Sequence, residues 1–275
     1  KSSISVSSTD LNQVLIGDKI NTVVIATQHN QHAKQVCEAL QAGKHVFVEK
    51  PLALTIEEIE DIRKAYYDQD GKCQLMVGYN RRFAPHVQRI KTLLEPLSDP
   101  KVFIMTMNAG AIANDHWTQD PNLGGGRILG EACHYIDLMR YLADSKIKSY
   151  TATSIGASPS ISITEDKAMI TLSFENGSIG TINYLANGGK VFPKERIEVF
   201  ASNAVLQLDN FRKLVGFGWE GFKKKGSLRQ DKGQFLCSQA FVTALKEGYT
   251  VPISFDEIIE VAKVSVKIAL MLRNP

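Results

Sequence analysis

Two short runs of apolar, mostly β-branched residues near the start of the chain have the pattern of strands buried on both faces of a parallel sheet. They cover residues 22–27 and 45–48. Between them, apolar residues recur at helical spacing from Ala33 to Leu40, and Gly43 is suited to end this helix in a left-handed turn. A strand, a helix and a strand joined by short links predict a right-handed βαβ unit.

The same alternation continues for one more helix and one more strand. Thr55 and Glu58 have the capping-box spacing that begins a helix, and apolar residues carry this helix to Tyr66. Residues 73–77 then have the pattern of a third strand. This order of elements predicts about half of a doubly wound, nucleotide-binding fold.

After Gly78 the pattern changes to that of an α+β domain. Residues 147–217 contain long alternating strands, and Asn176-Gly177 predicts a tight hairpin between two of them. Further helices are expected at 85–94, 128–142, 235–245 and 256–272, and a further strand at 102–107.

These patterns predict an α/β protein with two domains. Residues 1–78 would form the C-terminal part of a dinucleotide-binding domain, with a partial Rossmann-like parallel sheet. Residues 79–275 would form an α+β domain for substrate binding and oligomerisation, built on a large, mostly antiparallel sheet. We expect that the final helix of this second domain can pack against the first domain.

Composition and charge exclude several classes of protein. Of 275 residues, 44% are apolar and 22% are charged, as in ordinary globular proteins. The 32 basic residues exceed the 29 acidic ones by 3, which gives no reason to expect a nucleic-acid or membrane partner. Apolar runs are too short to span a bilayer, and no signal segment opens the sequence. The four cysteines lie far apart, so we expect reduced thiols, no metal and a cytoplasmic location.

The first candidate for chemistry is the tripeptide Glu49-Lys50-Pro51, which follows the second strand. In an open α/β sheet, ligands bind beyond the carboxyl ends of the strands. Pro51 restricts the backbone of Lys50, so the direction of the lysine is largely set. Lys50 could hydrogen-bond a substrate hydroxyl and stabilise its alkoxide, or it could be a surface lysine at a strand end.

The second candidate is the stretch from Gly124 to Asp137, a nearly apolar helix interrupted by Glu131, His134 and Asp137. A histidine beside a glutamate on a buried helix is costly unless it is paired, so it belongs either to a structural pair or to a polar cleft. The three glycines before it favour a flexible approach to the helix over a phosphate cradle. A GxGxxG match at 216–221 lacks the following helix and strand of a βαβ unit, so we do not interpret it as a phosphate loop.

Taken together, these residues resemble the Gfo/Idh/MocA family, named after glucose-fructose oxidoreductase, inositol dehydrogenase and rhizopine catabolism proteins. The resemblance is carried, in the expected order, by residues 23–33, 42–51, 78–85 and 124–137. It implies an oxidoreductase that depends on NAD or NADP and transfers a hydride to or from a hydroxyl-bearing carbon of a sugar, polyol or nucleotide sugar. It also implies a dimer or tetramer that pairs through the sheet of the second domain.

The resemblance assigns roles to individual residues. Lys50 matches the lysine that contacts the reacting hydroxyl and the nicotinamide, and His134 matches the general acid/base. The remaining positions are Thr27, His32, Glu49 and Pro51 on the cofactor side, and Asn80, Arg82, Glu131 and Asp137 on the substrate side.

Two departures from the family pattern matter. The family commonly has an aspartate four residues before the histidine, where this chain has Gly130. Glu131 is only a partial substitute, because one residue rotates a side chain by roughly 100° around a helix. No G-x-G-x-x-G turn precedes Asn21, so we expect the chain to begin partway through the nucleotide domain, as a fragment or a domain of a fusion.

Two other functions stay open, the first because this turn is missing and the second because the resemblance includes family members of that kind. One is a non-catalytic binding or assembly module that keeps the reductase-like surface. The other is a lyase or hydrolase that uses NAD transiently.

Overall fold

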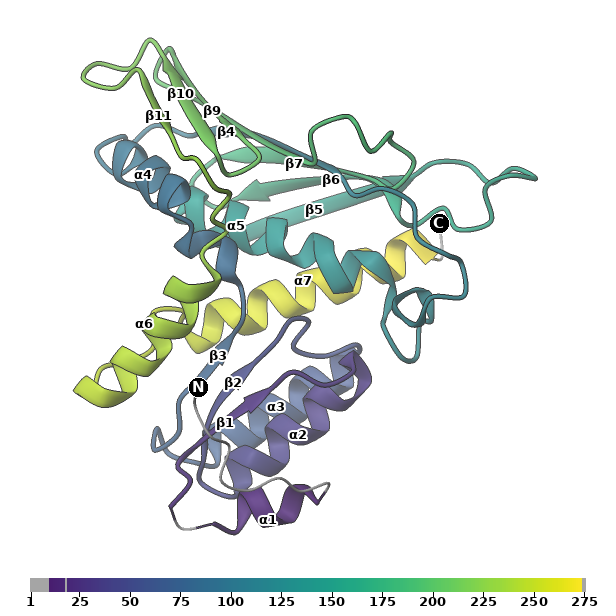
Figure 1. Ribbon diagram of the computed structural model, residues 1–275, viewed down its shortest axis with the longest axis vertical. Coiled ribbons are helices and arrows are strands. Elements are labelled where there is room, and N and C mark those ends of the chain that lie inside the picture. Colours follow the sequence, from purple (N-terminus) through teal and green to yellow (C-terminus); the bar gives the residue numbers. More distant parts are fainter. Residues whose placement is uncertain (1–9, 18, 274–275) are drawn as a thin grey trace.

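The computed structural model describes residues 10–17 and 19–273, which form two sheets with helices between and around them (Figure 1). The smaller sheet is parallel, with strands in the order β1 (Thr22–Ile25), β2 (His45–Val48) and β3 (Leu75–Val77). Helices α2 (His29–Gln41) and α3 (Ile56–Tyr67) connect these strands and pack against each other. A short helix, α1 (Leu11–Leu15), precedes them.

Local signals explain most of these boundaries. The Thr55 hydroxyl accepts a hydrogen bond from the Glu58 amide at 3.2 Å, and the Glu58 carboxylate accepts one from the Thr55 amide at 3.2 Å, so the predicted capping box is present. β1 differs from the prediction, because Val24 is 67% exposed. Within the described residues β1 is an edge strand, so its run of apolar residues is not buried on both faces.

The larger sheet has the strand order β11-β10-β9-β8-β4-β7-β6-β5. Its strands are β4 (Val102–Asn108), β5 (Ile147–Ser154), β6 (Lys167–Phe174), β7 (Ile179–Leu185), β8 (Glu195–Ala201), β9 (Ala204–Asp209), β10 (Lys213–Phe217) and β11 (Lys224–Gly226). All neighbours pair in antiparallel fashion except β4 and β7, which are parallel. The predicted hairpin at Asn176-Gly177 joins β6 to β7, and Gly177 has the positive φ of 83° that this turn requires.

Helical segments also follow β3 along the chain, and some of them lie between the two sheets (Figure 1). They are η1 (Asn80–Phe83), α4 (Pro85–Leu94), η2 (Trp117–Gln119), the π-helical η3 (Ile128–Ala132), α5 (Cys133–Ala143), α6 (Gln234–Glu247) and α7 (Phe255–Arg273). α7 lies between the sheets and contacts α5 and β5 on one side and α3 and β3 on the other (Figure 1). At its start, Phe255 stacks on Tyr66 of α3 with ring centroids 3.7 Å apart.

The predicted fold class is confirmed: a small Rossmann-like parallel sheet precedes a large, mostly antiparallel sheet. We retain the boundary between residues 78 and 79 as a proposal. The GxGxxG match falls on the end of β10 and the turn after it, not on a strand-to-helix link. Within the described residues, no helix is both long enough and apolar enough to cross a bilayer.

Candidate active site

Lys50 and His134, which are 84 positions apart in the sequence, line the same pocket. The pocket has a volume of about 270 Å³ and lies where the carboxyl end of β2 meets the junction of η3 and α5. Arg81, Arg127 and Glu131 are also among the residues that line it. The two sequence motifs that carried the predicted chemistry therefore meet at one cavity.

Lys50 connects the two sides of this pocket. Its ammonium group donates a hydrogen bond of 2.7 Å to the carbonyl of Gly130. Gly130 belongs to the π-helical turn, where the pairing of backbone carbonyls differs from that of an α-helix. The Lys50–Pro51 peptide bond is cis. The bond to Gly130 places the Lys50 ammonium on the pocket wall, and within the described residues no carboxylate hydrogen-bonds it.

His134 lies in the first turn of α5 and is 5% exposed. Its Nδ1 is buried and has no hydrogen-bond partner among the described residues, so Nε2 is the nitrogen left to meet a ligand. Burial lowers the pKa of His134 well below its ordinary value, and the positive charges of Arg81 and Lys50 act in the same direction. The imidazole is therefore neutral near pH 7 and able to accept a proton.

A buried ionic cluster that the sequence analysis missed holds Arg81 at the pocket. Glu195 at the start of β8 accepts hydrogen bonds from Arg81 at 2.8 Å and from the Tyr135 hydroxyl at 2.7 Å. Lys232 forms a further ion pair with the same carboxylate. These positive partners lower the pKa of Glu195 in spite of its burial, so the carboxylate stays charged.

A second cluster surrounds Glu131. Its carboxylate accepts hydrogen bonds from the Tyr184 hydroxyl at 2.6 Å and from Arg127 and Lys194 at 3.0 Å each. Against the effect of burial, the Tyr184 hydroxyl and the Lys194 ammonium lower the pKa of Glu131 to about 2. Glu131 therefore lines the pocket as a carboxylate whose oxygens already serve three donors.

Arg82 and Asp137, which were predicted on the substrate side, instead bind each other. Arg82 donates two hydrogen bonds to the Asp137 carboxylate, one of them at 3.1 Å from Nε, and the two residues are 3% and 0% exposed. Neither is among the residues that line the pocket. Their geometry is that of a structural ion pair, and the substrate contact that the resemblance implies for them stays a prediction.

Asn80 also lies behind the pocket. Its amide nitrogen donates a hydrogen bond of 2.7 Å to the carbonyl of Lys232, so it holds the segment that carries this lysine. The next residue, Gly233, is essential to this close approach, since a Cβ there would lie 2.5 Å from the Asn80 carbonyl oxygen. The substrate contact that the resemblance implies for Asn80 stays a prediction.

The predicted cofactor-side residues lie at the carboxyl ends of β1 and β2. Thr27 and Glu49 are exposed there, as a binding edge requires. His32 is fully buried, with Nδ1 2.7 Å from the carbonyl of Pro51 and Nε2 3.1 Å from that of Thr27. His32 therefore joins the turns after β1 and β2 and positions Pro51, and its place on the cofactor side stays a prediction.

The position where the family pattern has an aspartate is occupied differently here. A Cβ on Gly130 would lie 3.3 Å from Cε1 of His29, whose Nδ1 donates to the Gly124 carbonyl at 2.8 Å. Trp117 packs edge-on against His29, with their ring centroids 4.8 Å apart. A Cβ on Gly124 would lie 2.3 Å from Cα of Thr118, so the glycines before the helix serve close packing, and the predicted flexible approach is wrong.

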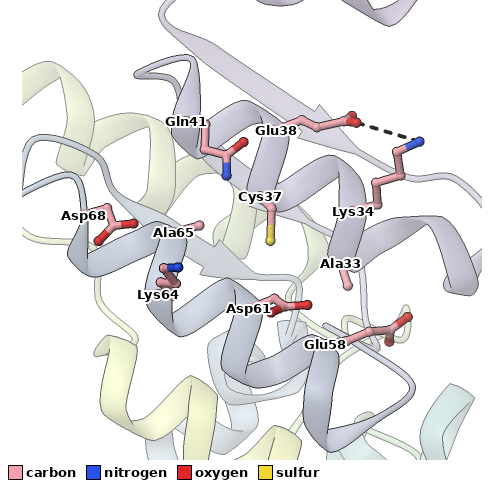
Figure 2. Close-up of a pocket in the computed structure, with 10 residues that line it drawn as sticks. All are labelled: Ala33, Lys34, Cys37, Glu38, Gln41, Glu58, Asp61, Lys64, Ala65 and Asp68. Atoms are coloured by element: carbon pink, nitrogen blue, oxygen red, sulfur yellow. Dashed lines mark ion pairs between the residues drawn. The ribbon is translucent and has the colours of Figure 1, made fainter.

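A larger hollow of about 520 Å³ lies between α2 and α3 (Figure 2). Acidic and basic side chains line it, and a Lys34–Glu38 ion pair of 3.8 Å runs along α2 at its edge. Burial raises the pKa of the Cys37 thiol there to about 11, so the thiol is not an activated nucleophile. None of the residues predicted to act in chemistry lines this groove, so the smaller pocket is the candidate site.

Known proteins share both parts of this architecture. A sequence model described as the oxidoreductase family with an NAD-binding Rossmann fold matches residues 2–79. A model of the GFO/IDH/MocA C-terminal domain matches residues 95–207. A solved structure of levoglucosan dehydrogenase in complex with NADH and levoglucosan superposes with a TM-score of 0.83 and 22% identity, covering 97% of this chain and 82% of that one.

Curated proteins with similar sequences are likewise named as oxidoreductases or dehydrogenases. The chain is 29% identical over 208 residues to the uncharacterized oxidoreductase YrbE of Bacillus subtilis, covering 74% of this chain and 59% of that protein. It is 26% identical over 212 residues to myo-inositol 2-dehydrogenase of Thermotoga maritima, covering 74% and 60%. The chain thus spans at most about three fifths of the length of these two relatives.

The fold therefore defines a Rossmann-like nucleotide-binding module followed by an α/β module with a large open sheet. With both family models matched in order, the chain belongs to the Gfo/Idh/MocA family.

Proposed function

We propose that this chain is the catalytic part of an oxidoreductase that depends on NAD or NADP and acts on a hydroxyl-bearing carbon of a sugar, polyol or nucleotide sugar. The observation that carries the proposal is the meeting of Lys50 and His134 in one pocket at the carboxyl end of β2. Inositol and levoglucosan dehydrogenases among the relatives support this class of substrate.

The residues present fit the nicotinamide half of the cofactor. Thr27 and Glu49 are exposed at the ends of neighbouring parallel strands, and Lys50 and Pro51 follow directly. These residues would hold the cofactor at the pocket mouth. The nicotinamide, when bound, supplies the hydride chemistry. In the described residues, the turn from β1 into α2 contains no glycine. We therefore assign no residue to the pyrophosphate of the cofactor.

In this mechanism, the substrate hydroxyl lies between the two candidate residues. Neutral His134 takes the hydroxyl proton at Nε2 as the alcohol is oxidised, and returns it in the reverse direction. Proton transfer of this kind contributes about 10²–10⁴ in rate. Lys50 donates a hydrogen bond to the same oxygen and stabilises the alkoxide. The Gly130 carbonyl holds the ammonium in position before the substrate arrives.

The test is cofactor binding and turnover by the full-length protein that carries this chain. Titration of NADH should shift its fluorescence emission, and a panel of sugars, polyols and nucleotide sugars should show reduction of NAD or NADP at 340 nm. His134→Ala should lower turnover at least tenfold with cofactor affinity nearly unchanged.

Negative results distinguish the competing functions. NADH fluorescence that does not change would favour the binding or assembly module. Conversion of a sugar without net reduction of cofactor would favour a lyase or hydrolase. Unchanged turnover of His134→Ala would refute the assignment of the base.

A further inference from the structure

Positive charge dominates the wall of the pocket. Lys50, Arg81 and Arg127 line it, and Glu131 is the only carboxylate among the described residues that line it. Behind this wall, Lys194 is paired with Glu131, and Lys232 with Glu195.

The ion pairs of these groups do not neutralise the site. Two carboxylates, Glu131 and Glu195, face five cations: Lys50, Arg81, Arg127, Lys194 and Lys232. Because His134 is neutral, these groups carry an excess of three positive charges around one small cavity, and all the cations except Lys194, whose side chain is 45% exposed, are buried or half-buried. Poorly hydrated, uncompensated charge is costly in a folded protein, and an anionic ligand is the partner that would offset this cost.

Arg81 gives a second, independent reason to expect an anionic ligand. The residue is 5% exposed, and in the part of the chain that the structure describes its buried Nε has no hydrogen-bond partner, although Nη2 binds Glu195. Guanidinium groups suit carboxylates and phosphates because they offer several N–H donors in a fixed plane. Arg127 is a second guanidinium on the same wall.

The size of the cavity limits the ligand. Its volume of about 270 Å³ lies just below the range of about 300–1,000 Å³ that is usual for ligand pockets, which suits one sugar ring or a polyol of similar size. We propose that the pocket selects a sugar or polyol that carries an anionic group, a carboxylate or a phosphate monoester, and that Arg81 and Arg127 determine this specificity. This inference rests on the proposed function and narrows its substrate class.

Trp117 offers a direct measurement of binding. It lies between His116 and Thr118, which both line the pocket, so its fluorescence reports occupancy without turnover. In a Trp219→Phe background, the full-length protein is titrated with galacturonate and glucuronate, with the neutral sugars galactose and glucose, and with galactose 1-phosphate. Inorganic phosphate alone shows whether the anion suffices without the sugar.

We expect at least one anionic sugar to bind tenfold or more tightly than its neutral counterpart, with a preference that weakens as salt is added. Arg127→Gln and Arg81→Gln should each lower this preference at least fivefold. The control Arg196→Gln removes an arginine whose partner Asp209 lies outside the pocket, and should leave the preference unchanged. If a glutamine variant fails to fold by circular dichroism, Arg127→Lys, which keeps the charge, should retain most of the preference.

The outcomes separate this inference from the proposed function. Turnover of neutral sugars with no advantage for acids or phosphates overturns the inference alone. A clear anion preference in binding, with no hydride transfer to any member of the panel, overturns the proposed function alone. Absence of both overturns both, and inorganic phosphate binding as tightly as the sugar acids overturns selection of a sugar.

Discussion

The Lys50 ammonium donates a 2.7 Å hydrogen bond to the carbonyl of Gly130, and this bond joins the end of the parallel sheet to the helix that carries His134. The first module thereby supplies the positive group of the pocket, and the second supplies the base. Neither module contains the candidate site alone, so its geometry depends on their packing through α7.

Replacing Lys50 tests its role directly. Lys50→Met should lower kcat by about 10²–10³, the effect of removing one preorganised donor to a developing oxyanion. Lys44→Met is a matched control at the other end of β2, because Lys44 also donates to a backbone carbonyl, that of Gly17, at 3.1 Å. The control should keep kcat within about twofold of the parent. Equal losses in both variants would mean that Lys50 acts only through stability, and urea denaturation of each variant measures that contribution.

The lowered pKa of His134 predicts an unusual pH profile. The folded imidazole stays neutral below the ordinary histidine pKa of about 6.5, so it remains a competent base there. In the direction of alcohol oxidation, kcat/KM should therefore stay level as the pH falls from about 8 through 6.5. The measurement is a pH–rate profile of the parent protein. An inflection that belongs to His134 at an ordinary histidine pKa would contradict the buried, cation-surrounded environment.

His29 predicts a loss of stability in mild acid. Burial lowers the pKa of His29 to about 4 in the folded protein, whereas an unfolded histidine titrates near 6.5. Between these values the unfolded state binds more protons, so stability is complete above about pH 6.5 and falls as the pH drops toward 4. The slope from one such residue reaches about 1.4 kcal/mol per pH unit.

Urea unfolding at several pH values checks this expectation. His29→Gln should reduce the acid-side slope, and the exposed control His116→Gln should not change it. A slope that His29→Gln leaves untouched would show that protonation of His29 is not linked to unfolding.

The buried ion pair of Arg82 and Asp137 should matter for stability more than for substrate binding. Asp137→Asn leaves the Arg82 charge without its main partner in a buried site, which costs about 3–5 kcal/mol. The exposed pair of Arg196 and Asp209 is the control, because exposed ion pairs contribute about 0–1 kcal/mol. The substrate KM of Asp137→Asn, measured under conditions where the variant is folded, should stay close to that of the parent. A large rise in KM without loss of stability would restore the substrate role suggested by the family pattern.

Elements with local signals could be predicted from the sequence. Pro85 at the first position of α4 and the Asn176-Gly177 turn each set a boundary through their own backbone preferences, and the structure places both as expected. The resemblance also named Lys50 and His134 as the two residues of the reaction, because each lies in a motif of the family.

The rest of the pocket depends on interactions that a local pattern does not contain. Arg81 faces the pocket and Arg82 faces away, yet they are neighbours in a 3₁₀ turn, where successive side chains diverge by about 120°. Glu195 and Tyr184 reach the site through strands far along the chain, so only the strand register places them there. The expectation that Glu131 only partly replaces the family's aspartate assumed α-helical geometry. Ile128–Ala132 is instead a π-helical turn.

The outer face of the large sheet carries an exposed row of apolar side chains, which bears on the expected assembly through this sheet. Val102 on β4 pairs in register with Ile179 on β7 and with Phe200 on β8, so the three side chains form a row across neighbouring strands. They are 41%, 48% and 39% exposed. An apolar row across a sheet that is uncovered in a single chain is typical of a surface that pairs with a second copy.

We predict a dimer or tetramer by light scattering, and dissociation to single chains in Ile179→Glu. Leu228→Glu is the control, because Leu228 is 95% exposed but lies in a loop away from this row. A parent protein that is already a single chain, or equal dissociation of both variants, would exclude assembly through this face.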